Sequence, residues 1–369
     1  MDIWALLNYG FMGIAAALSL LPGTEADPRE LALLQNAQQQ VAGENGADAL
    51  YRLKELGAVW PEKIPVCERG RTDCLALARE QHEHWARLPE KDYATWQAVD
   101  EYIAALGQYG HFRYPFFMET DTPHLAVLMQ NNRLHAYRFV DGAPQAALDA
   151  TCRDAQLALT FINSQNTLID SMIGAALLRQ SVMLIAEMLA EVPTLSLSPA
   201  CDGVQTLPGE TLAICPLLLG EWRTQENSLR QEMAKLPPTD IVLAAWYRQF
   251  LANLTYEYSR YCEPDIIAGI ARGELAMPPL ENGMPKHCSP LNALCHIAQP
   301  GFVRSQKMLL NSNRYLAAFD ALRDAQAPLA QGIRREQGRL VFTRFAERAE
   351  EGEAMVEMVL PLPGSRVKP

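Results

Sequence analysis

The sequence lacks the short motifs that mark common catalytic and cofactor sites. It contains no G-x-G-x-x-G or G-x-x-x-x-G-K-[ST] phosphate loop, no G-x-S-x-G nucleophile motif, no H-E-x-x-H zinc motif and no EF-hand loop. No C-x-x-C pair occurs, and no spacing of His and Cys resembles a zinc site. We therefore predict no catalytic residue set, no metal site and no cofactor.

Basic residues are also scarce. The chain has 32 Lys and Arg against 43 Asp and Glu, which gives a formal net charge of -11. Binding to nucleic acid needs a basic surface that faces the phosphates, so this function class is excluded, and adsorption to an anionic membrane surface is disfavoured. With 369 residues, 49% of them hydrophobic and 20% charged, the chain is predicted to be globular, with two or three domains or one large helical array.

A long segment near the N-terminus lacks charge. The segment IWALLNYGFMGIAAALSLLP, from Ile3 to Pro22, holds no charged residue and has about the twenty residues that a helix needs to span a bilayer. Asp2 stands where a signal peptide normally has Lys or Arg. We expect residues 1–26 to be a signal peptide, cleaved after Ala26, or an N-terminal membrane anchor. A buried N-terminal core helix is the alternative.

Cysteine is present in an even number, and every cysteine follows the apolar segment. The eight residues, all predicted to form disulfides, are Cys67, Cys74, Cys152, Cys201, Cys215, Cys262, Cys288 and Cys295. Proximity in sequence favours three local pairs, 67–74, 201–215 and 288–295, which leaves 152–262 as a long-range pair, although eight cysteines allow about 105 connectivities. Disulfides imply an oxidising compartment. Reduced thiols in a cytosolic protein are the alternative.

Helical spacing of apolar residues recurs along most of the chain. The predicted helices are 31–41, 50–56, 73–88, 92–106, 124–139, 144–163, 166–191, 209–235, 238–261 and 302–324. Two short segments near the end, 338–344 and 354–360, have strand patterns. The predicted fold is mainly α, an irregular multi-helix bundle of helical hairpins with a small C-terminal β-hairpin. A loop rich in Pro, Ser and Gly at 193–208 predicts a boundary between a helical region at 27–192 and a second at 193–369, unless the two form one continuous domain.

Two of these helices carry unusual residues. The helix at 166–191 is apolar around most of its circumference, so we expect it to be central and buried, with Asp170, Arg179 and Glu187 paired inside the protein. The helix at 238–261 carries six aromatic residues, which at helical spacing indicate a core helix.

The segment 109–124 is the best candidate for binding a ligand. Aromatic side chains in YGHFRYPFF are followed at once by charged ones, and such a mixture can line a cleft and orient a ligand. The predicted ligand-binding residues are His111, Arg113, Glu119, Asp121 and His124. The alternative is a loop that packs its rings onto helices and pairs its charges locally.

The chain resembles a group of uncharacterised exported proteins of Gram-negative bacteria. The segments that carry this resemblance are CERGRTDCLALA, YGHFRYP, LIDSMIGAALLRQ and SPLNALCHIAQPGFVRSQKMLLNSNRYLAAFDALRDA. The part LNALCHIAQPGF departs from the pattern of the group, which has an Asn-Pro-containing loop there. The resemblance implies an exported helical protein, and it implies no activity.

These observations lead to three functional hypotheses. The first is a periplasmic or inner-membrane-anchored protein that catalyses no reaction and binds another envelope protein, as an immunity-type inhibitor or an envelope-assembly accessory would. The second is an enzyme or small-ligand binder that uses the segment 109–124. The third is a cytosolic helical protein with reduced cysteines.

Overall fold

The computed structural model describes residues 26–37, 40–53, 55, 73–114, 125–237, 240–279, 286–287, 302–324, 328–347 and 355–365. The predicted signal peptide or anchor therefore lies, apart from Ala26, outside the described residues. The chain divides into two units that alternate along the sequence, which we call unit 1 and unit 2. The sequence predicted two consecutive regions instead, at 27–192 and 193–369, whereas each unit takes elements from both.

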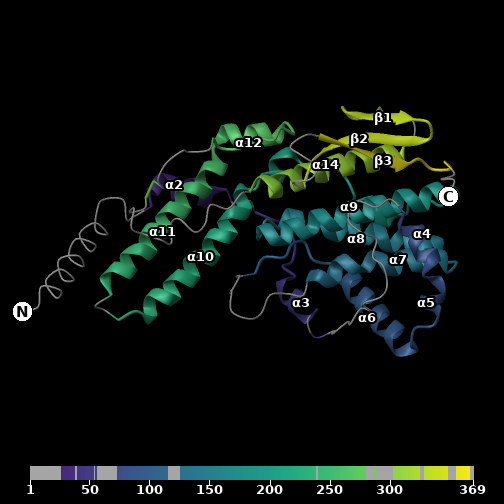
Figure 1. Cartoon of the computed structure of the whole chain (residues 1–369), viewed down its shortest axis with the longest axis horizontal. Coiled ribbons are helices and arrows are strands. Elements are labelled where there is room, and N and C mark those ends of the chain that lie inside the picture. The colour runs from purple at the N-terminus through teal and green to yellow at the C-terminus, as the bar shows by residue number, and fades with distance from the viewer. Residues whose placement is uncertain are drawn as a thin grey trace, which may run out of the picture. The chain divides into compact units, whose positions relative to one another are not determined.

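Unit 2 is the larger and holds most of the helices (Figure 1). Its helical elements are α3 (Ala47–Arg52), α4 (Cys74–Glu80), α5 (His82–Ala86), α6 (Glu90–Leu106), η1 (Leu125–Gln130), α7 (Asn131–Val140), α8 (Pro144–Ser164), α9 (Leu168–Glu191), η2 (Pro199–Cys201), η3 (Gly209–Leu212) and, from Arg304 on, α14 (Val303–Arg323). The predicted helices 92–106, 144–163, 166–191 and 302–324 are confirmed by α6, α8, α9 and α14.

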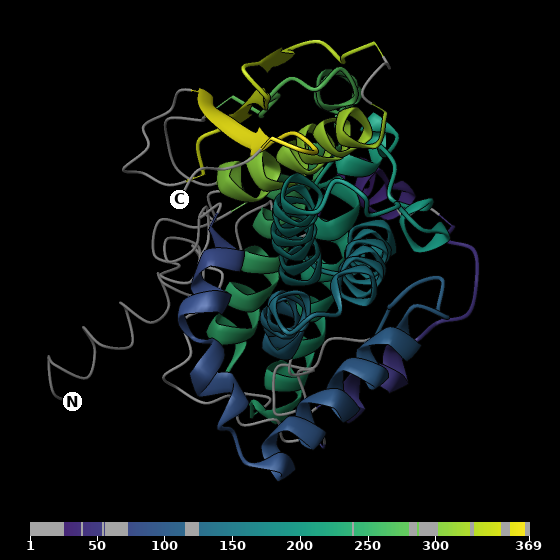
Figure 2. The same ribbon diagram turned by 90° about the vertical axis from the view of Figure 1, so that its right-hand side faces the viewer.

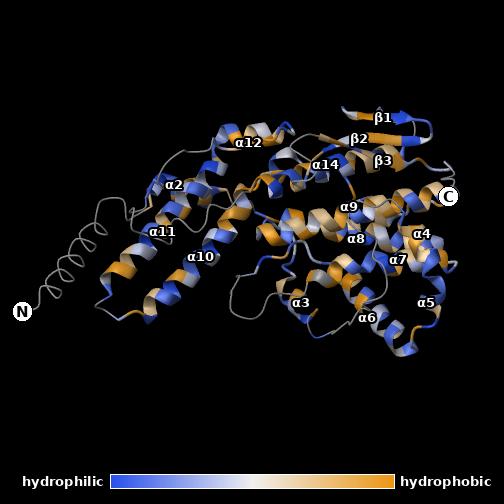
Figure 3. Ribbon diagram, in the orientation of Figure 1, coloured by the Kyte–Doolittle hydropathy of each residue, from blue (hydrophilic) through white to orange (hydrophobic). Residues whose placement is uncertain are grey.

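Helices α8 and α9 lie side by side at the centre of unit 2 (Figure 1 and Figure 2). Gly174 allows this close packing, because a Cβ atom there would lie 2.8 Å from the Ala158 carbonyl oxygen. Among the described residues, α9 alone has the length and composition of a membrane span, but 78% of its most apolar window is buried inside the protein. Figure 3 shows this helix as largely hydrophobic. The prediction of a central, buried helix is confirmed.

A three-stranded antiparallel sheet completes unit 2. Its strands are β1 (Ile333–Glu336), β2 (Arg339–Phe345) and β3 (Met355–Pro361), in the order β1-β2-β3. The predicted hairpin corresponds to β2 and β3, and β1 is an additional strand. Gln337 and Gly338 both have positive φ, 48° and 76°, as a tight two-residue hairpin turn requires. The sheet packs on α14, where the rings of Tyr315 and Phe342 lie 5.4 Å apart edge to face.

Unit 1 is a smaller group of helices. Its elements are α2 (Pro28–Asn36), α10 (Cys215–Lys235), α11 (Ile241–Ser259), η4 (Arg260–Cys262) and α12 (Pro264–Ala271). Helices α2, α10 and α11 pack on one another. The side chains of Asp27 and Asp240 accept hydrogen bonds from backbone N–H groups at the starts of α2 and α11, so both are N-caps.

Two boundary predictions are wrong for a physical reason. The predicted helix 73–88 is two helices that meet at Gln81, where the backbone leaves the helical region. The stretch between the predicted helices 238–261 and 302–324 contains a further helix, α12, because Pro264 occupies the first turn of a helix, where its missing N–H costs nothing.

Two disulfides are formed among the described residues, and both correct the predicted pairing. Cys152 pairs with Cys201, and Cys215 pairs with Cys262, in place of 201–215 and 152–262. The first joins α8 to η2. The second joins the start of α10 to η4, which directly follows α11, because α10 and α11 run antiparallel. Cys74 is also disulfide-bonded, whereas Cys67, Cys288 and Cys295 lie outside the described residues.

Candidate functional site

The predicted ligand-binding segment is described up to Tyr114. His111 and Arg113 are therefore placed, whereas Glu119, Asp121 and His124 lie outside the described residues. The chain at Asn45–Gly46 runs beside the segment. The Gly46 N–H donates to the His111 carbonyl oxygen at 2.8 Å, and the Asn45 side chain bonds both backbone groups of Arg113 at 2.6 and 2.9 Å. This clamp fixes the backbone of 111–113.

Arg113 has a structural role at one of its side-chain atoms. Its Nε donates to the carbonyl oxygen of Ser164 at 2.6 Å, and the Phe112 N–H donates to the Ser164 hydroxyl at 2.8 Å. Ser164 ends α8, and Gln165 follows it in the left-handed conformation, with φ 48°. Carbonyl oxygens at a helix C-terminus lack intrahelical hydrogen-bond donors, and Arg113 supplies such a donor to the Ser164 carbonyl oxygen.

Tyr114 and Asp170 connect the same segment to α9. The Tyr114 hydroxyl donates to Oδ1 of Asp170 at 2.7 Å, and the Asn166 amide donates to Oδ2 at 2.8 Å. Burial raises the pKa of Asp170, although these hydrogen bonds oppose the rise. Both carboxylate oxygens are thus occupied by the protein's own donors.

An open hollow of about 230 Å³ lies beside this clamp, between α3 and α6. Its lining residues are Asp48, Ala49, Arg52, Tyr102, Ala105, Leu106, Gln108 and Tyr109. The Tyr102 hydroxyl donates to the Ala49 carbonyl oxygen at 2.7 Å, and this hydrogen bond links α6 to α3. Burial raises the pKa of Tyr102, while the charge of Arg52 lowers it and that of Glu55 raises it. The hollow thus combines two phenol rings with charges of both signs.

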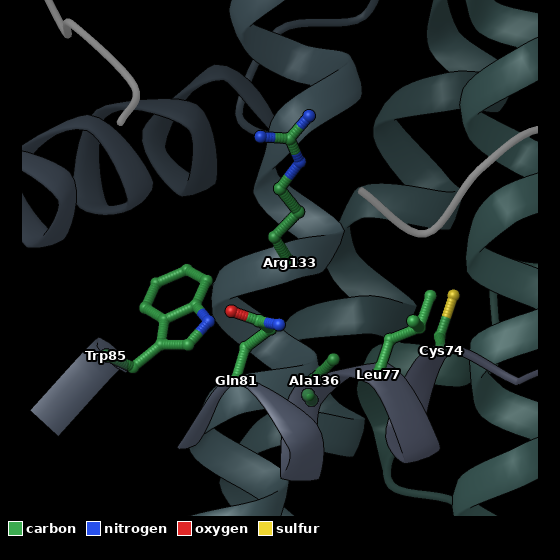
Figure 4. A pocket seen from close by; sticks show the side chains of 7 residues that line it. Cys74, Leu77, Gln81, Trp85, Arg133 and Ala136 are labelled. Carbon is green, nitrogen blue, oxygen red and sulfur yellow. The ribbon is translucent and has the colours of Figure 1, made fainter. Parts of the chain in front are cut away.

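A second, much smaller crevice lies between α4, α5 and α7 (Figure 4). Arg133 of α7 points away from Gln81 and Trp85 in that view. Burial lowers the pKa of Arg133 to about 10. Its volume is about 10 Å³, roughly the room that one water molecule needs. This crevice is therefore too small to be a ligand site.

A buried polar cluster in unit 2 joins α6, α7 and α8. His135 is fully buried, and its Nε2 lies 2.9 Å from Oδ2 of Asp154. The Asn131 amide donates to Asp154 at 2.9 Å and to Asp100 at 3.0 Å, and Arg138 pairs with Asp100. Burial alone would raise the pKa of Asp100, but the neighbouring His135 and Arg138 hold it below its usual value. The cluster links three helices, which is a structural role.

Two further charged groups of α9, Arg179 and Glu187, are also engaged, as the sequence predicted. Arg179 pairs with Glu347 at 2.9 Å, and the Asn311 amide donates to the same carboxylate at 2.8 Å. Glu187 accepts a hydrogen bond from the Leu75 N–H at 2.9 Å, at the first turn of α4. Burial nevertheless raises the pKa of Glu187 to about 7. These groups hold α9 to α14 and α4.

No protein-family model, curated protein or solved structure matches this chain. Within the described residues, no group of three or more His, Cys, Asp or Glu is arranged to hold a metal ion. Tyr109 belongs to the predicted ligand-binding segment, whereas Asp48, Arg52 and Tyr102 were not predicted from the sequence. No spacing signal joins them, since α3 and α6 are distant in the sequence and meet only in the fold.

Proposed function

We propose that this chain is an exported protein of the bacterial envelope, periplasmic or anchored in the inner membrane, that binds another envelope protein and catalyses no reaction. The observation that carries the proposal is the pair of disulfides, Cys152–Cys201 and Cys215–Cys262. All four cysteines are buried. Buried disulfides of this kind form and persist in oxidising compartments and are rare in the cytosol.

The use of the buried polar groups supports a binding role. Asp170, Arg179 and the cluster around His135 have protein partners that connect helices. A rigid, cross-braced helical scaffold keeps its surface preorganised, which lowers the entropic cost of docking a partner. An immunity-type inhibitor and an envelope-assembly accessory both fit this description.

The test is photo-crosslinking of the full chain in envelope extracts of its native host, followed by mass spectrometry of the adducts. We expect one envelope protein to be captured, and the purified partner to bind again in calorimetry with a stoichiometry of one chain to one partner. The proposal fails if no captured protein binds again after purification.

The small-ligand hypothesis is a second candidate, because the hollow begins at Tyr109, the first residue of the predicted segment. His111→Ala tests it more cleanly than Arg113→Ala. Only the backbone of His111 takes part in the clamp described above, whereas Arg113 Nε supports the end of α8. Loss of small-molecule binding in His111→Ala, with unchanged thermal unfolding, would favour this candidate over protein binding.

A further inference from the structure

We propose that the hollow between α3 and α6 receives a lysine or arginine side chain of the partner protein. The inference rests on the proposed function and adds to it the chemistry of the partner's contact. The volume of about 230 Å³ is below the roughly 300–1,000 Å³ of ordinary small-molecule pockets. It therefore suits a single inserted side chain better than a free ligand.

The two tyrosine rings of the hollow are held in place by the fold. Tyr102 is fixed by its hydrogen bond to Ala49. Tyr109 packs edge to face on Phe112, with ring centroids 6.2 Å apart, and rests against Gly46, where a Cβ atom would lie 2.5 Å from the Tyr109 ring. Aromatic rings attract cations that approach their faces. Fixed rings offer this attraction without an ordering cost when the partner binds.

The charges around the hollow favour a cation as the occupant. Asp48 lines it, and Glu55 is close enough to raise the pKa of Tyr102; both are exposed. Arg52 also lines the hollow, and its positive charge repels a cation there. The net charge of the chain, -11, attracts a basic protein from a distance and accelerates its association.

Arg52 gives the inference a sharp test, because its removal has opposite consequences for the two classes of occupant. With a cationic side chain in the hollow, Arg52→Ala removes a repulsion and tightens binding. With a carboxylate there, the same substitution removes the attracting group and weakens binding. A gain of affinity also cannot arise from misfolding.

The experiment measures fluorescence anisotropy of a labelled peptide with arginines spaced by glycines, and of a matched glutamate peptide, against the full chain. We expect Tyr109→Ala to weaken the arginine peptide about tenfold, as loss of a desolvated cation–π contact does, and Tyr109→Phe to retain most of the affinity. Asp48→Asn should weaken it and Arg52→Ala should tighten it. The control is Asp202→Asn, an exposed carboxylate elsewhere in unit 2, which should change nothing.

The inference is overturned if the arginine peptide does not bind or if all variants bind it with the same affinity. It is also overturned if Arg52→Ala lowers the affinity for the glutamate peptide without raising the affinity for the arginine peptide. The crosslinking experiment separates this failure from that of the proposed function. A partner captured equally by the unaltered chain and by Tyr109→Ala would remove the hollow and leave the proposed function standing. Absence of any partner would remove the proposed function itself.

Discussion

The two units both contain a disulfide but differ in how deeply their main apolar helix is buried. Each contains a disulfide between two described cysteines that spans a similar length of chain, 49 residues in unit 2 and 47 in unit 1. Their main apolar helices differ in burial. Nearly every side chain of α9 is buried, whereas Trp246, Tyr247 and Phe250 of α11 are only half-buried.

This difference qualifies the prediction of a core helix at 238–261. Tyr258 and Leu254 are buried, so the prediction holds for the second half of α11, near the disulfide, and not for the first half. Unit 2 distributes its stability over α8, α9 and many polar links. Unit 1 has a smaller core, so we expect its stability to depend more on its disulfide.

The largest effect should follow from removing the disulfide of unit 1. Cys215→Ser with Cys262→Ser should lower the free energy of unfolding by about 4 kcal/mol, from the chain entropy of a loop of this length. Hydrogen exchange measured by mass spectrometry should then show loss of protection in α10 and α11. In the matched variant, Cys152→Ser with Cys201→Ser, α8 and α9 should stay protected. Greater loss in α8 and α9 than in α10 and α11 would reverse the comparison.

A smaller effect, dependent on pH, should arise from Glu187. Its pKa is raised from 4.5 to about 7 in the folded protein, so the folded state binds more protons than the unfolded state between these values. Stability therefore falls as pH rises through this window, by about 3 kcal/mol in total. Glu187→Gln keeps an acceptor for the Leu75 N–H and removes the titration.

Urea unfolding at pH 5 and pH 8 measures this effect. The glutamine variant should gain stability over the unaltered chain at pH 8 and gain little at pH 5. Asp100→Asn is the control, because the pKa of Asp100 is lowered in the folded protein and that of Glu187 is raised. Because the folded pKa of Asp100 lies below 3.8, its stabilising contribution is present above that value and is lost only in acid. An equal effect of Glu187→Gln at both pH values would contradict the account.

The packing of α8 on α9 predicts an intermediate effect. Gly174→Ala would place a Cβ atom 2.8 Å from a backbone carbonyl in unit 2, and overpacking of this kind should cost about 2 kcal/mol. Gly269→Ala in α12 of unit 1 meets the side chain of Ala276 at 2.6 Å. Ala276 lies outside the helices and strands, where no helical hydrogen bonds hold its backbone, so we expect a smaller cost. Thermal unfolding of the two variants decides, and equal costs would argue against a more rigid interior in unit 2.

The smallest effect concerns one hydrogen bond in unit 1. Trp222 Nε1 donates to Thr255 Oγ1 at 2.8 Å between α10 and α11. Thr255→Val leaves this buried indole N–H without its acceptor and should cost about 1.5 kcal/mol. In unit 2, Thr151 is equally buried, but its hydroxyl donates to Ala147 within the same helix. Thr151→Val should cost less in urea unfolding, and an equal or larger cost would contradict the expected contribution of the link between α10 and α11.

The sequence predicted the helices and strands better than the tertiary contacts between them. Helices α6, α8, α9 and α14 are long enough for apolar periodicity to define them. Strand β1 was missed because Ile333–Glu336 is mostly charged, and its only signal is the turn at Gln337–Gly338. The pairing of Cys215 with Cys262 depends on the antiparallel course of two helices, which spacing alone does not encode.

The candidate site was predicted even less completely. The segment 109–124 was located by its aromatic and charged composition, and Tyr109 does line the hollow. Arg113, predicted to contact a ligand, donates its Nε to the end of α8 instead, and whether its other atoms serve a ligand stays a prediction. Asp48, Arg52 and Tyr102 become neighbours only because α3 packs beside α6.

The most direct test of export is mass spectrometry of the intact chain from its native host, after cell fractionation, with and without reduction. We predict a species in the envelope fraction that gains one hydrogen for each of its eight cysteines on reduction, which corresponds to four disulfides. The mass of its N-terminus would distinguish a cleaved signal from an anchor. A cytosolic species with free thiols and an intact N-terminus would contradict the proposal and favour the cytosolic hypothesis.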